Sequence, residues 1–176
     1  MKHPLQFIPH GKLRYAMIPA LLLTFATVGS LPFIMPLRDS GTVVELVEAG
    51  SAPEVDRLVQ GWSQSERVTA AYAVGLDYLM TPAYMTVFAV ALVWSARRAR
   101  SNVVRQGSIG LTWICTALPL TNVLENVMLR DAFLGEVTDP WPLLAAIHHY
   151  SSGVTVLAAI ALVSLAVLFP TRARSS

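Results

Sequence analysis

Residues 121–129 read Thr-Asn-Val-Leu-Glu-Asn-Val-Met-Leu and place one carboxylate and two amides near the end of a long apolar run. Asn122, Glu125 and Asn126 are spaced i, i+3 and i+4, so on an α-helix their side chains share one face. An ionisable group at membrane depth is costly and is therefore a candidate for function. We expect this face to look into a helical bundle.

The apolar run is one of four segments that are long enough to cross a bilayer, which takes about 20 apolar residues. The 176-residue chain is 54% hydrophobic and only 14% charged, a composition typical of multi-span membrane proteins. The predicted spans cover residues 15–37, 68–94, 108–129 and 142–169. The sequence thus predicts an all-α, four-transmembrane-helix bundle: a single membrane domain over 15–170, with short tails at 1–14 and 171–176.

Charge is distributed unevenly among the segments that connect the spans. The tail 1–14, the connection between the second and third spans, and the tail 171–176 together hold nine of the 13 lysines and arginines and none of the 11 acidic residues. Basic residues collect on the cytoplasmic side of membrane proteins. We therefore predict a multi-pass protein of the plasma membrane, the inner membrane of a bacterium, with both termini in the cytoplasm.

The loop 38–67 is the only sizeable segment predicted outside the membrane. It contains three S/T-x-x-E patterns, which are typical of helix starts, at Thr42–Glu45, Ser51–Glu54 and Ser63–Glu66. Between the second and third patterns, apolar residues recur at helical spacing: Val55, Leu58, Val59 and Trp62. We expect two short amphipathic helices in this extracytoplasmic loop, acting either as an ordinary connector or as a lid.

Counting residues inward from the outer end of each predicted span brings further polar groups to the level of Glu125. Asp77 in the second span and His148 and His149 in the fourth lie at a similar depth, and Tyr84 shares the face of Asp77. His148 and His149 are about 100° apart on a helix, so we expect one of them to join the layer. The candidate ligand- or ion-binding residues are Asp77, Tyr84, Asn122, Glu125, Asn126, His148 and His149.

Several chemistries remain open for this layer. It could relay protons, hold a cation, dock the polar end of a lipid-like or quinone ligand, or simply fix the helices together by hydrogen bonds. Haem could bind through His148 or His149, although the sequence supplies no clear second axial ligand. The paired Glu-x-x-His pattern of di-iron bundles is absent, and we assign no metal site and no cofactor.

The sequence also argues against other classes of protein. A single cysteine, Cys115, rules out an internal disulfide and the CxxC chemistry of membrane thiol oxidoreductases. There is no zinc-ligand spacing and no glycine-rich phosphate loop. The basic residues are few and flank the predicted spans, so nucleic acid is not an expected partner.

Three motifs in order resemble an uncharacterised group of small bacterial four-span membrane proteins. They are Gly41-Thr-Val-Val-Glu45-Leu followed by Ala49-Gly50-Ser51, then Gly75-Leu76-Asp77-Tyr78, and finally Glu125-Asn126-Val127. The resemblance implies the same four-span fold and carries no activity with it. On sequence alone we expect a structural, accessory or partner-binding membrane subunit in the lipid bilayer, with a membrane-protein partner or a second copy of itself. The alternative is a binding or catalytic pocket at the polar layer.

Overall fold

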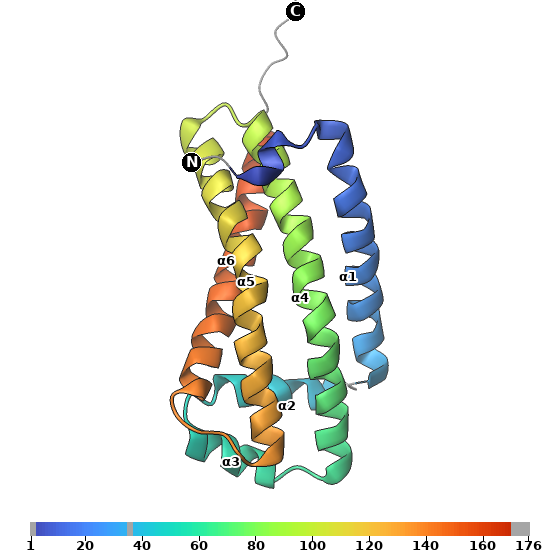
Figure 1. The fold of residues 1–176 in the computed structure, drawn as a ribbon, viewed down its shortest axis with the longest axis vertical. Coiled ribbons are helices and arrows are strands. Elements are labelled where there is room, and N and C mark those ends of the chain that lie inside the picture. The colour runs from blue at the N-terminus through green and yellow to red at the C-terminus, as the bar shows by residue number, and fades with distance from the viewer. Residues whose placement is uncertain (1–2, 35–36, 170–176) are drawn as a thin grey trace, which may run out of the picture.

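The computed structural model describes residues 3–34 and 37–169, and in these residues it contains helices and no β-strand. Over this part of the chain, two short 3₁₀ turns are followed by six α-helices, arranged as Figure 1 shows. In chain order the elements are η1 (Pro4–Phe7), η2 (His10–Lys12), α1 (Arg14–Ile34), α2 (Leu37–Glu48), α3 (Ala52–Gln60), α4 (Gln64–Arg98), α5 (Asn102–Leu134) and α6 (Trp141–Leu168). The predicted all-α class is confirmed.

Four of these helices, α1, α4, α5 and α6, are long and apolar enough to cross a membrane, as the sequence predicted. They run alternately up and down, so that α1 begins and α6 ends at the same end of the molecule, here called the terminal end (Figure 1). α2 and α3 lie at the opposite end, here called the α2/α3 end. α4 is the central helix, since it contacts α1, α5 and α6.

The helices and the predicted spans do not share the same limits. α4 has 35 residues and α5 has 33, so each is roughly 50 Å long, well beyond the ~30 Å hydrocarbon core of a bilayer. Hydropathy marks the apolar middle of each helix, whereas hydrogen bonding continues it into polar sequence at both ends. α1 ends at Ile34, and Leu37 of the predicted first span already belongs to α2.

α2 closes part of the α2/α3 end and begins earlier than predicted. It starts at Leu37, so the pattern at Thr42–Glu45 lies inside the helix and does not open it. The prediction of a helix start there was wrong because the same pattern also fits helix interiors. Leu46 and Val47 are buried against the bundle, and α2 passes behind α4 and α5 in the view of Figure 1.

α3 begins at the predicted place but is capped by a different side chain. Ser51 is the N-cap residue, yet its hydroxyl makes no capping bond. Instead, the backbone N–H of Ala52 donates to Oδ1 of Asp139 at 3.0 Å, from the loop before α6. Val55, Val59 and Trp62 are buried and Leu58 is half-buried, so the predicted apolar face packs on the bundle.

The start of α4 follows the sequence prediction closely. The hydroxyl of Ser63 accepts from the N–H of Glu66 at 3.3 Å, and the Glu66 carboxylate accepts from the N–H of Ser63 at 2.6 Å. This reciprocal capping box satisfies two of the backbone donors that a helix N-terminus leaves free. The third S/T-x-x-E pattern is therefore confirmed as a helix start.

Residues 3–8 fold back onto the terminal end, which the sequence did not predict. His3 is only 3% exposed, with Nε2 3.2 Å from the hydroxyl of Thr116 and its ring edge on Trp113. The guanidinium of Arg97 lies within hydrogen-bonding distance of three carbonyl oxygens of this segment, those of Leu5, Gln6 and Ile8. One arginine at the end of α4 thus holds the N-terminal segment in place.

Candidate functional site

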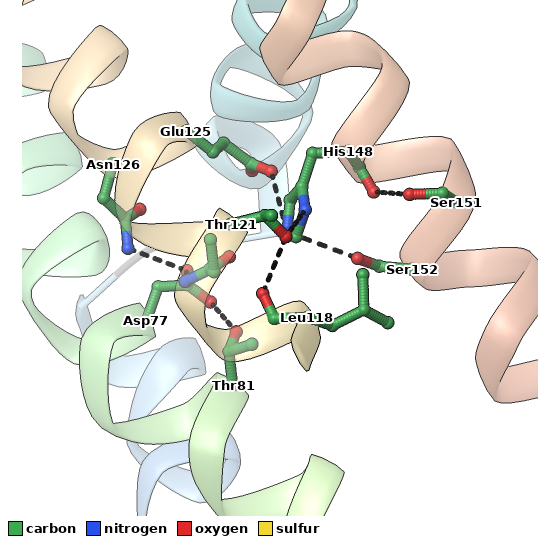
Figure 2. A network of polar contacts seen from close by, with 10 residues as sticks. Asp77, Thr81, Leu118, Thr121, Glu125, Asn126, His148, Ser151 and Ser152 are labelled. Atoms are coloured by element: carbon green, nitrogen blue, oxygen red, sulfur yellow. Dashed lines mark hydrogen bonds and ion pairs between the residues drawn. The ribbon is translucent and has the colours of Figure 1, made fainter. Parts of the chain in front are cut away.

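The predicted polar residues meet near the α2/α3 end of the bundle, where α4, α5 and α6 face one another (Figure 2). Asp77 comes from α4, Asn122, Glu125 and Asn126 from one face of α5, and His148 from α6. The i, i+3, i+4 spacing on α5 brings its three polar side chains to the interior, where each is 9% exposed or less. The bundle thus gathers them from three helices.

Asp77 is the centre of one hydrogen-bond network. Its Oδ2 accepts from Nδ2 of Asn122 at 2.6 Å and from Nδ2 of Asn126 at 3.1 Å. Its Oδ1 accepts from the hydroxyl of Thr81, one turn further along α4, at 2.9 Å. Three donors therefore fix this carboxylate and tie α4 to α5.

His148 is the centre of the second network. Its Nδ1 lies 2.8 Å from the hydroxyl oxygen of Thr121, and its Nε2 lies 3.3 Å from the hydroxyl of Ser152. The same Nε2 is 3.7 Å from Oε2 of Glu125, within ion-pair distance but beyond a hydrogen bond. This network ties α5 to α6, as the dashed lines in Figure 2 show.

One acceptor in this layer has no partner among the described residues. Oδ1 of Asn126 is buried and accepts no hydrogen bond. The orientation of this amide is set by its other end, because Nδ2 is the atom that can donate to Asp77. Exchanging the two ends would put Oδ1 against the carboxylate, so the free acceptor is a consequence of the Asp77 contact.

The polar layer forms one side of a cavity of about 540 Å³. The other walls are apolar and come from the end of α1, from α2 and from the neighbouring turns of α4 and α5. The apolar lining residues are Val28, Leu31, Pro32, Val43, Val44, Val47, Ala73, Val74, Met80 and Leu129. The α2 valines belong to the loop predicted as a connector or lid, and they form part of the cavity wall.

All seven candidate residues line this cavity, so the structure brings together the whole predicted set. His148 takes part in the hydrogen-bond network, whereas the neighbouring His149 lines the wall and stacks edge-on against Tyr150. Tyr84 also lines the wall, with its ring against Phe88. Because consecutive helix positions are ~100° apart, His148 joins the hydrogen-bond network and His149 does not, although both line the cavity.

Sequence reasoning missed two hydroxyl partners of His148. Thr121 lies four residues before Glu125, and Ser152 lies four residues after His148, so helical spacing would have placed both on the layer's face. Two other hydroxyls at a compatible depth, those of Thr27 and Ser30, do not join it. They donate to carbonyl oxygens of their own helix, α1.

A polar ligand head suits this arrangement better than a metal ion does. Among the described residues, no three His, Cys, Asp or Glu side chains come close enough together to hold a metal. The Glu125 carboxylate instead offers a hydrogen-bond site beside an apolar space. Such a combination of apolar walls and a few convergent polar groups is typical of small-molecule pockets.

The chain matches no protein-family model, no curated protein and no solved structure, so its function has to be argued from the site itself.

Proposed function

We propose that this four-span membrane protein binds one small, largely apolar molecule in the cavity at the polar layer. The observation that carries the proposal is the cavity itself. Its volume of about 540 Å³ lies within the range of small-molecule sites, ~300–1,000 Å³. Its walls are apolar on the sides formed by α1 and α2 and polar on the side formed by α4, α5 and α6.

Interhelical bonding alone is the main competing explanation for the polar layer. A layer that served only to join helices would pair its buried groups with one another. Asp77 meets this expectation, whereas Glu125 accepts no hydrogen bond from the described residues and Asn126 keeps an unpaired acceptor. These unpaired groups favour a binding role, because a polar group without a partner inside a membrane is costly.

The hypothesis of an accessory or partner-binding subunit stays a prediction. Large apolar side chains are exposed along α1 and α6, among them Leu22, Phe25, Val154 and Leu157. Lipid chains cover such faces as well as a protein partner would. The cavity is a specific observation in favour of small-molecule binding, and the accessory role has no comparable observation behind it.

For the orientation, we infer a plasma-membrane protein, in bacteria of the inner membrane, with the terminal end in the cytoplasm. The support is the distribution of basic residues, since the α4–α5 connection carries Arg97, Arg98, Arg100 and Arg105. This connection and the start of α1 lie together at the terminal end (Figure 1). The cavity would then open in the outer half of the bilayer.

Filling the cavity tests the proposed function. Ala73 lines the cavity and is 8% exposed, while Ala71, on the same helix, is exposed and lies outside it. Native mass spectra of protein released from lipid nanodiscs should show one bound small molecule on the wild type and on Ala71→Phe, and none on Ala73→Phe. Circular dichroism melting checks that both variants are folded. The same bound masses on all three proteins, or none on the wild type, would overturn the proposal.

A further inference from the structure

We infer that the molecule in the cavity carries an amine with a positive charge at its polar end, received by Glu125. This inference rests on the proposed function and adds the chemical class of the ligand. Three properties of the layer lead to it: which acceptors are already used, which remain free, and which charges surround them.

Asp77 is already occupied by protein donors. Its two carboxylate oxygens accept from Thr81, Asn122 and Asn126. A ligand would have to displace one of these bonds to reach it. Asp77 therefore joins α4 to α5 and is not the acceptor that receives the ligand.

Among the residues that the structure describes, none donates a hydrogen bond to Glu125, although His148 is close. Thr121 has one hydroxyl hydrogen, and its oxygen lies 2.9 Å from the carbonyl oxygen of Leu118, to which it donates. The 2.8 Å contact with His148 then has Nδ1–H as the donor. In the neutral ring Nε2 is consequently an acceptor, filled by the Ser152 hydroxyl, and cannot supply a hydrogen to Glu125.

The free groups are thus acceptors, and the fixed charge around them is negative. The cavity lining contains the carboxylic acids Asp77 and Glu125 and, among the described residues, neither lysine nor arginine. A carboxylate or phosphate head would meet these acids with no arginine of the described lining to balance it. A quinone offers only carbonyl acceptors and would supply no donor to the Glu125 carboxylate. An alkylammonium group supplies both N–H donors and the opposite charge.

The apolar walls define the rest of the ligand. The side chains facing the polar layer across the cavity are branched aliphatic groups of α1 and α2, such as Val28, Leu31 and Val47. They suit a hydrocarbon body and provide no further polar anchor. The ligand class is therefore an amphiphilic amine with one cationic head and a compact apolar tail.

A series of ten-carbon probes with different heads tests this assignment. We would measure the binding of decylamine, decyltrimethylammonium, decanol and decanoate to the purified protein in one detergent, so that the tail is constant. We expect decylamine to bind at least tenfold more tightly than decanol or decanoate. Decyltrimethylammonium has the charge but no N–H donor. Its affinity should therefore lie between that of decylamine and those of decanol and decanoate.

Glu125→Gln should reduce decylamine affinity at least tenfold and leave decanol affinity unchanged. Glu45→Gln, a change at an exposed acid of α2 outside the cavity, is the control and should alter neither. If Glu125→Gln does not fold, the head-group series on the wild type decides alone. If decanol and decylamine bind equally well and neither binds to Ala73→Phe, the amine assignment is overturned and the proposed binding cavity stands. No effect of Ala73→Phe on any probe would overturn both.

Discussion

At the scale of single residues, Asp77 joins two helices of the bundle beside its cavity. The three donors around its carboxylate come from α4 and α5, and one of them fixes the amide that leaves a free acceptor. Depth counting along each helix was enough to predict that Asp77 and Glu125 share a layer. It could not predict which acid is bonded and which is free, because that depends on side-chain geometry between helices.

Graded replacement of Asp77 tests this role. In Asp77→Asn the new amide can still accept from α5 and donate to Thr81, so we expect less than about 1 kcal/mol of lost stability. In Asp77→Leu three donors lose their acceptor, and each unpaired buried group costs about 1–3 kcal/mol. The measurement is the free energy of unfolding in mixed detergent and sodium dodecyl sulfate. Equal effects of the two substitutions would contradict the network.

At the scale of elements, the three S/T-x-x-E patterns of the loop had three different outcomes. The first lies inside α2, the second begins α3 without a bond from its serine, and the third forms a complete capping box on α4. The pattern is local, whereas the N-cap of α3 is served by Asp139, 87 positions away in sequence. Local signals thus predicted that short helices exist, and distant contacts decided how they begin.

Cap substitutions separate these cases. Ser63→Ala should lower the unfolding free energy by about 1 kcal/mol, since the hydroxyl accepts the N–H of Glu66. Ser51→Ala should change it by less than about 0.5 kcal/mol because its hydroxyl caps nothing. Asp139→Ala should behave like Ser63→Ala, since it removes the acceptor for Ala52. A larger loss of unfolding free energy in Ser51→Ala than in Asp139→Ala would show that α3 is capped in another way.

At the scale of the whole molecule, the bundle has two unlike ends. The terminal end carries the basic α4–α5 connection and the folded-back N-terminal segment, and the opposite end carries the short helices (Figure 1). The cavity lies near the α2/α3 end, since residues of α2 line it. Composition and charge were sufficient to predict four spans. The docking of residues 3–8 was beyond the reach of sequence patterns, because a polar tail containing Leu5 and Ile8 gives no periodic signal.

Cysteine labelling tests the proposed orientation. Ser101→Cys lies in the connection between α4 and α5, and Thr138→Cys lies in the loop between α5 and α6; both positions are exposed. The native Cys115 is 1% exposed and should stay unlabelled. In intact bacterial spheroplasts, a membrane-impermeant maleimide should label Thr138→Cys at once and Ser101→Cys only after permeabilisation. The reverse pattern would invert the orientation.

The hydrogen bonds between Arg97 and the N-terminal segment also set an order of events during synthesis. A chain leaves the ribosome with its N-terminus first, yet His3 finds its partner 113 positions later and Leu5 finds Arg97 92 positions later. The segment therefore has to wait, undocked, until α4 and α5 have been made and inserted. Its closure marks a chain that has been made as far as α5, and a chain interrupted before α5 would display an open segment to a quality-control protease.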